Sequence, residues 1–111
     1  MNGTLIKSIV KGSGGGASSV VTDGDNTGLV VKSGTIYDFG DTPIDTLVLT
    51  SVEKSYNESV IYFTTSGTIT FTDNSGLKWG GGSAPSLEAN TIYCIAINNG
   101  LAEIDSFGTT A

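Results

Sequence analysis

The chain contains no histidine, a single cysteine (Cys94) and a single tryptophan (Trp79) among 111 residues. Without histidine, neither a Ser-His-Asp nor a Cys-His arrangement can form, and the commonest general base near neutral pH is missing. A single cysteine excludes an intramolecular disulfide and the thiolate clusters of zinc and iron–sulfur sites. We therefore expect a protein that is not an enzyme, with no catalytic residues and no cofactor.

Basic residues are also scarce. Five Lys and Arg stand against eleven Asp and Glu, which gives a net charge of −6. Such a balance disfavours contact with nucleic acid phosphates and anionic membranes. No apolar run approaches the roughly 20 residues that cross a bilayer, and the first residues lack the layout of a signal peptide. We expect no nucleic acid binding, no membrane insertion and synthesis in a cytoplasm.

What the sequence does contain is a series of short segments rich in Val, Ile, Thr, Tyr and Phe, each closed by Gly, Asp, Asn or Ser. This pattern is typical of antiparallel strands joined by turns, and no segment favours a helix. The expected strands are 5–10, 18–21, 29–31, 35–39, 46–52, 59–64, 68–72, 91–98 and 101–107.

Alternation of side chains predicts how two of these strands are buried. In 68–72, Ile69 and Phe71 point one way and three threonines the other, so one face is expected in the core and one in solvent. In 91–98 neither face is polar before Asn98. This second strand is expected to be central and covered on both sides.

Two turns predict hairpins. Asn99 and Gly100 form an Asn-Gly pair, which accepts the positive φ values of a tight type I′ turn, so 91–97 and 101–107 are expected to be neighbours. Ser66-Gly67 predicts a second hairpin, between 59–64 and 68–72.

These features predict an all-β fold, an antiparallel β-sandwich of jelly-roll or immunoglobulin-like kind. No fixed internal period is visible, which argues against a solenoid. Residues 1–16 are expected to form an N-terminal strand or arm with a glycine-rich linker, and residues 17–111 the sandwich domain.

Two loop motifs can each be interpreted as a ligand-binding site or as an ordinary loop. Residues 12–17 match G-x-G-x-x-A, a pyrophosphate-binding pattern, but no helix follows, and a flexible linker is favoured. Residues 23–28 resemble the start of an EF-hand loop, yet Gly34 stands where a bidentate Glu is needed. A polar turn is favoured there, and weak calcium binding by Asp23 and Asp25 stays open.

Sugar binding is the main alternative to an assembly role, because small β-sandwiches often present aromatic rings to sugars. Carboxylates for glycoside hydrolysis are available, but the sequence pairs no two of them at a defined separation. The aromatic candidates are Trp79, Tyr37, Tyr56 and Tyr62.

The stretch from Thr68 to Ile104 resembles a terminal β-module of bacteriophage virion proteins, namely fibre, baseplate and head-decoration proteins of phages of gut bacteria, including crass-like phages. In that module a strand ends near a Trp, a glycine-rich turn and a Pro follow, and a Leu-Glu-Ala-Asn turn leads into a long strand and an Asn-Gly hairpin. The matching positions are Trp79, Gly80, Gly81, Gly82, Pro85, Leu87, Glu88, Asn90, Tyr93, Ile95, Ile97, Asn99 and Gly100.

The resemblance implies a structural virion protein of a tailed phage, a head-fibre or capsid-decoration subunit, with a tail-fibre or baseplate module that binds host surface glycans as the alternative. Expected partners are further copies, as a trimer or dimer, and the major capsid protein or other fibre proteins. The glycines would let backbones approach closely, Pro85 would end strand pairing, and Trp79 would be structural.

The N-terminal segment offers two roles. Residues 1–11, with Leu5, Ile6, Ile9 and Val10, either dock on a virion partner as an added strand or complete the fold of their own chain.

Overall fold

The computed structural model describes residues 19–109, which contain eight β-strands and no helix. The strands are β1 (Ser19–Val21), β2 (Leu29–Val31), β3 (Thr35–Asp38), β4 (Ile44–Val52), β5 (Ser59–Asp73), β6 (Lys78–Trp79), β7 (Thr91–Asn98) and β8 (Leu101–Thr109). The predicted all-β class is therefore confirmed. The predicted strand 5–10, its residues Leu5, Ile6, Ile9 and Val10, and the boundary at residues 16 and 17 lie outside the described residues.

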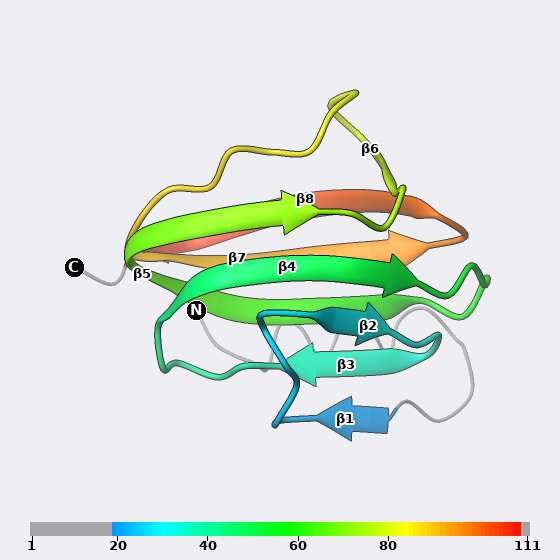
Figure 1. Ribbon diagram of the computed structural model, residues 1–111, viewed down its shortest axis with the longest axis horizontal. Coiled ribbons are helices and arrows are strands. Elements are labelled where there is room, and N and C mark those ends of the chain that lie inside the picture. The colour runs from blue at the N-terminus through cyan, green and yellow to red at the C-terminus, as the bar shows by residue number, and fades with distance from the viewer. Residues whose placement is uncertain (1–18, 110–111) are drawn as a thin grey trace.

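The strands form two layers that share β5. The large layer has the order β1-β3-β5-β7-β8-β6, and the small layer contains β2, β4 and the second half of β5. Residues 59–64 of β5 pair with β3 and β7, whereas residues from Thr65 onward pair with β4. Figure 1 shows the ribbon of β5 turning back at one end of the molecule as it passes from one layer to the other.

Most of the pairing is parallel. The ladders β1–β3, β2–β4, β3–β5, β4–β5 and β6–β8 are parallel, and only β5–β7 and β7–β8 are antiparallel. The prediction of an antiparallel fold is thus wrong for most of the sheet. Successive strands alternate between the layers: β1 and β3 lie in the large layer, β2 and β4 lie in the small layer, and β5 passes from the large layer to the small one. Each turn of the chain therefore stacks on the one before in a solenoid-like arrangement.

The predicted hairpin at Ser66-Gly67 is wrong for the same reason. No ladder joins the two halves of β5, because each half pairs with strands of a different layer. The hairpin at Asn99-Gly100 is confirmed: β7 and β8 are antiparallel neighbours, and the two turn residues have φ values of 52° and 78°.

One apolar core lies between the layers. In the large layer it contains a row of directly paired residues, Tyr37 with Ile61 and Ile61 with Ile95. In the small layer Leu47 and Leu49 of β4 have no exposed surface. This core, which we call the central core, also includes Leu29, Val31, Phe63, Trp79, Tyr93, Ile97 and Ala102.

A second apolar cluster lies on the other face of the large layer. It comprises Ile36, Val60, Tyr62 and Cys94, with Ile92 and Phe107 packed against them. The two faces of β7 are therefore both apolar and both buried, as its sequence predicts: Tyr93 and Ile95 belong to the central core and Cys94 to this outer cluster.

Candidate functional site

Trp79 lies at the edge of the large layer, where β6 pairs with β8 in parallel. The main chain is held on both sides of it, since Lys78 N donates to Gly100 O at 3.0 Å and Gly80 N donates to Ala102 O at 3.0 Å. The side chain is only 8% exposed, and its indole meets the ring of Phe71 edge-on at 5.8 Å. The indole therefore joins the end of β5 to the edge strand β6.

The polar atom of Trp79 has a specific partner. Its Nε1 donates to Asp73 Oδ2 at 2.8 Å, and the other oxygen of Asp73 accepts from the backbone N–H and hydroxyl of Ser75. A buried indole N–H needs such an acceptor. Sequence reasoning missed Asp73, although its position at the end of the alternating run 68–72 is the signal that could have indicated it.

The three glycines after Trp79 have different roles. Gly82 N donates to Trp79 O at 2.8 Å, which closes a tight turn, and Gly82 has a φ of 93° that favours glycine. A Cβ on Gly80 would lie 3.3 Å from Cγ of Glu103, whereas one on Gly81 would meet nothing within 4 Å. The predicted close approach thus concerns Gly80 alone and involves a side chain, not a second backbone.

This difference gives a matched pair of variants. We expect Gly82→Ala to lower the free energy of unfolding by about 1–2 kcal/mol, because alanine is strained at positive φ. Gly81→Ala, one residue earlier in open space, should change it by less than about 0.5 kcal/mol. Urea denaturation of both variants checks this, and equal losses would contradict the assigned geometry.

The segment after the turn is fixed by Tyr93 and Thr65. The Tyr93 ring stacks on Phe63 at 5.6 Å, and its hydroxyl oxygen accepts from Glu88 N at 2.8 Å. Buried Thr65 donates to Glu88 O at 2.6 Å and accepts from Thr91 N at 2.9 Å. The prediction that Pro85 ends strand pairing is wrong, because β6 already ends at Trp79.

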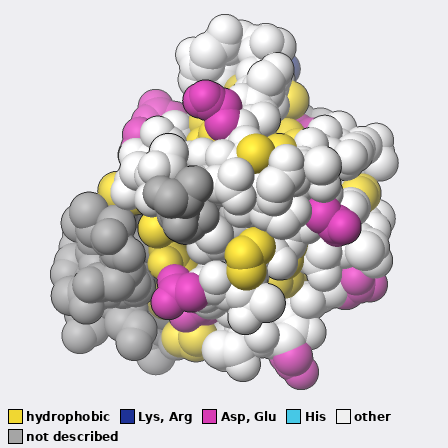
Figure 2. Space-filling view, turned by 90° about the vertical axis from the view of Figure 1, so that its left-hand side faces the viewer, with side chains coloured by type: hydrophobic (Ala, Val, Ile, Leu, Met, Phe, Trp, Pro, Cys, Tyr) yellow, Lys and Arg dark blue, Asp and Glu magenta, His cyan; other side chains and the backbone are white. Residues whose placement is uncertain are grey.

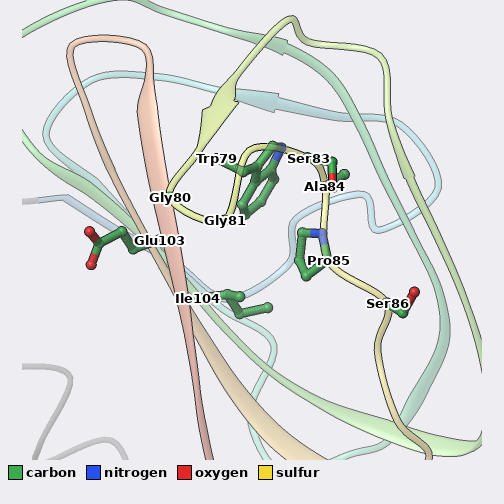
Figure 3. Close-up of a pocket in the computed structure, with 9 residues that line it drawn as sticks. All are labelled: Trp79, Gly80, Gly81, Ser83, Ala84, Pro85, Ser86, Glu103 and Ile104. Atoms are coloured by element: carbon green, nitrogen blue, oxygen red, sulfur yellow. The ribbon is translucent and has the colours of Figure 1, made fainter.

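A shallow groove of about 550 Å³ lies beside this segment. Figure 3 shows Pro85 and Ile104 on the same side of β8 as the Trp79 ring, with Glu103 projecting from the opposite side of the strand. The lining residues are Trp79, Gly80, Gly81, Ser83, Ala84, Pro85, Ser86, Glu103 and Ile104. The groove can offer hydroxyl and carboxylate groups, but the buried indole leaves little ring surface on which a sugar could stack.

The other aromatic candidates are mostly engaged within the fold. The Tyr37 hydroxyl accepts from Lys32 N at 2.7 Å and donates to Val30 O at 3.1 Å. Tyr62 is 3% exposed and donates to Asp41 at 3.0 Å. Of the four aromatic candidates, only Tyr56 is exposed, with an exposed fraction of 80%.

The calcium interpretation gains no support. Asp25 Oδ1 accepts from Thr27 N at 3.0 Å and from the Thr27 hydroxyl at 2.6 Å, a polar turn that lowers the pKa of Asp25. Within residues 19–109 no three His, Cys, Asp or Glu side chains gather in a group that could hold a metal ion.

Cys94 has the environment of a buried, unreactive thiol. Burial raises its pKa to about 12, and the nearby Asp105 and Glu58 carboxylates add to the effect. Burial also raises the pKa of Tyr62 to about 12, together with its hydrogen bond to Asp41. A thiolate is the nucleophilic form, so Cys94 is not prepared for covalent chemistry.

These raised pKa values predict alkaline sensitivity. An unfolded cysteine ionises near pH 9 but folded Cys94 near 12, so the stability present below pH 9 should fall as the pH rises from 9 to 12. We expect Cys94→Ala to show a shallower fall. Urea denaturation from pH 8 to 11 checks this; parallel curves for the two proteins would show that Cys94 does not contribute.

The part of the chain that the structure describes has no helix long and apolar enough to span a membrane. Comparison with protein-family models, with curated proteins and with solved structures found no match.

Proposed function

We propose that the chain is a structural virion protein of a tailed bacteriophage, a head-fibre or capsid-decoration subunit that acts by assembly and surface display. One observation carries the proposal. The residues that match the phage β-module hold the fold together: Trp79 is buried and bonded to Asp73, Tyr93 anchors the segment before β7, and Asn99-Gly100 forms the hairpin. The module is therefore used as architecture, the role that the resemblance implies.

The surface supports the same proposal. Figure 2 shows Asp and Glu side chains dispersed over a face that is mostly neutral, with small apolar patches between them. Such a surface desolvates at a low electrostatic cost when it meets a protein partner. We propose that the chain forms a closed dimer or trimer and binds the major capsid protein or another fibre protein, which places it in the virion.

We propose further that the domain is a two-layer β-sandwich, because the central core lies between the large and small layers. A jelly-roll or immunoglobulin-like assignment has little support, since only two of the seven ladders among residues 19–109 are antiparallel.

Binding to phage heads tests the function. Purified protein is added to heads of the encoding phage that were prepared without it, and the bound fraction is measured by sedimentation. We expect saturable binding at a fixed number of copies per head. Heads of an unrelated phage serve as the control, and equal binding to both kinds of head, or to neither, would contradict the proposal.

A glycan-binding module of a tail fibre or baseplate is the second candidate. Exposed Tyr56 and the groove with Ser83, Ser86 and Glu103 favour it, because a ring face, hydroxyls and a carboxylate are the groups that contact sugars. A glycan array tests this candidate. Binding that is lost in Tyr56→Ala or in Glu103→Gln, with the fold intact, would establish it in place of the assembly role.

A further inference from the structure

The outer cluster of the large layer lacks a cover within residues 19–109. The central core draws side chains from both layers, but the outer cluster contains residues of the large layer alone. Nevertheless Ile36, Val60, Tyr62 and Cys94 are only 7%, 0%, 3% and 4% exposed. Side chains that stand side by side on one face of a sheet shield one another's flanks but not their outward ends, so this face requires a covering segment.

The face has a defined shape and charge. Its apolar residues cross the layer in register, because Ile36 pairs with Val60 and Tyr62 pairs with Cys94. Carboxylates border it: Asp41 accepts from the Tyr62 hydroxyl at 3.0 Å, and Asp105 pairs directly with Cys94 across the β7–β8 ladder. A fitting occupant is apolar along its length and carries positive charge.

The chain contains one segment of this kind outside the described residues. Residues 4–11, TLIKSIVK, combine Leu5, Ile6, Ile9 and Val10 with Lys7 and Lys11, and no acidic residue occurs before Asp23. Two of the five basic residues of the chain thus lie in these eight positions. No other stretch outside residues 19–109 offers both properties to an acidic, apolar surface.

The connection is long enough. Residues 12–18, GSGGGAS, separate the segment from β1 and can span about 23 Å when extended. β1 is at the edge of the large layer and β7 lies three strands away, a distance of about 14 Å.

We propose that residues 4–11 dock on the outer face of the large layer of their own chain and cover the cluster of Ile36, Val60, Tyr62 and Cys94. Leu5, Ile6, Ile9 and Val10 supply the apolar contact, and the two lysines lie near the bordering carboxylates. The N-terminal segment then belongs to the fold of its own chain and is not an arm that reaches a virion partner.

Cys94 is a built-in probe of this cover, because it is the only cysteine and lies within the cluster. The rate of its labelling by a maleimide is measured in the full chain and in a chain that begins at residue 12. We expect labelling on the order of tenfold faster, or more, in the shortened chain. If that chain fails to fold, the double variant Ile6→Ser with Ile9→Ser takes its place, and Thr4→Ala with Ser8→Ala in the same segment is the matched control. Equal rates in the full chain and the variant would overturn the proposal.

A disulfide test distinguishes this chain's segment from that of a second copy. In Ile9→Cys, mild oxidation is expected to produce a disulfide to Cys94 within one chain, seen as a faster monomer band on a non-reducing gel. Thr50→Cys, exposed on β4 in the small layer, is the control and should give no such band. A disulfide-linked dimer as the main product of Ile9→Cys would assign the cover to a second copy and overturn the proposal as stated.

Discussion

Replacing Trp79 with alanine is expected to lower the free energy of unfolding by about 3–5 kcal/mol, the range for removal of a buried large aromatic side chain. The physical reason is that three contacts are lost together. The indole fills part of the central core, meets Phe71 edge-on at 5.8 Å and donates to Asp73 at 2.8 Å. Since Trp79 is the only tryptophan, unfolding in urea is followed by circular dichroism and not by fluorescence.

Two further variants separate the contributions of Trp79. Trp79→Phe keeps most of the apolar surface but leaves Asp73 without its partner, so we expect a smaller loss, of about 1–3 kcal/mol. Tyr56→Ala removes an aromatic ring that is 80% exposed and should change stability by less than about 0.5 kcal/mol. A Trp79→Ala protein that keeps full stability but loses glycan binding would contradict the architectural role.

Phe63→Ala is expected to have an effect of similar size, about 3–5 kcal/mol. Phe63 lies in the half of β5 that pairs with both β3 and β7, has no exposed surface, and stacks on Tyr93 at 5.6 Å. The cavity would therefore open at the point where the solenoid-like part of the chain meets the β7–β8 hairpin. A domain of this size has only about 5–15 kcal/mol of stability, so the variant should be marginally folded at 37 °C.

The control for Phe63 is Leu101→Ala, which removes a side chain that is 57% exposed at the start of β8. It should change the urea midpoint little, because that side chain gains little from burial. Comparable losses for Phe63→Ala and Leu101→Ala would show that the central core is not organised around β5.

Local features of this fold could be predicted from the sequence because they depend on neighbouring residues. The predicted strands 29–31, 35–39, 46–52, 91–98 and 101–107 coincide with observed strands within two residues. The Asn99-Gly100 hairpin could also be predicted from the sequence, because the two turn residues themselves favour the positive φ values of a tight turn.

Strand partners could not be predicted in the same way. Alternation assigns the faces of a strand but is the same for parallel and antiparallel neighbours. Ser66-Gly67 has the composition of a hairpin turn, yet the chain continues there into the other layer, a choice made by distant strands β3 and β4.

The solenoid-like arrangement could not be predicted from the sequence, because the number of residues between paired positions is irregular. Paired residues lie 16 positions apart between Ser19 and Thr35 but 24 apart between Ile36 and Val60. No fixed period therefore exists in the sequence, although successive turns of chain stack in space.

The sequence predicted several residues of the candidate site, but it did not predict the contacts that these residues make. Trp79 and Tyr93 were predicted to be structural, but their hydrogen bonds to Asp73 and Glu88 were not predicted. The bond from Thr65 to Glu88 could not be, because it joins positions 23 residues apart that only the fold brings together. Gly81 matches the module but meets no neighbour, so nothing in the structure explains a glycine there.

We propose that this protein acts by assembling with copies of itself and with a virion partner, and the mass of the purified full chain in solution tests the self-assembly most directly. Light scattering over a hundredfold range of concentration should give a single mass of twice or three times that of the 11.3 kDa chain. A mass that stays at that of one chain throughout this range would contradict the proposed self-assembly.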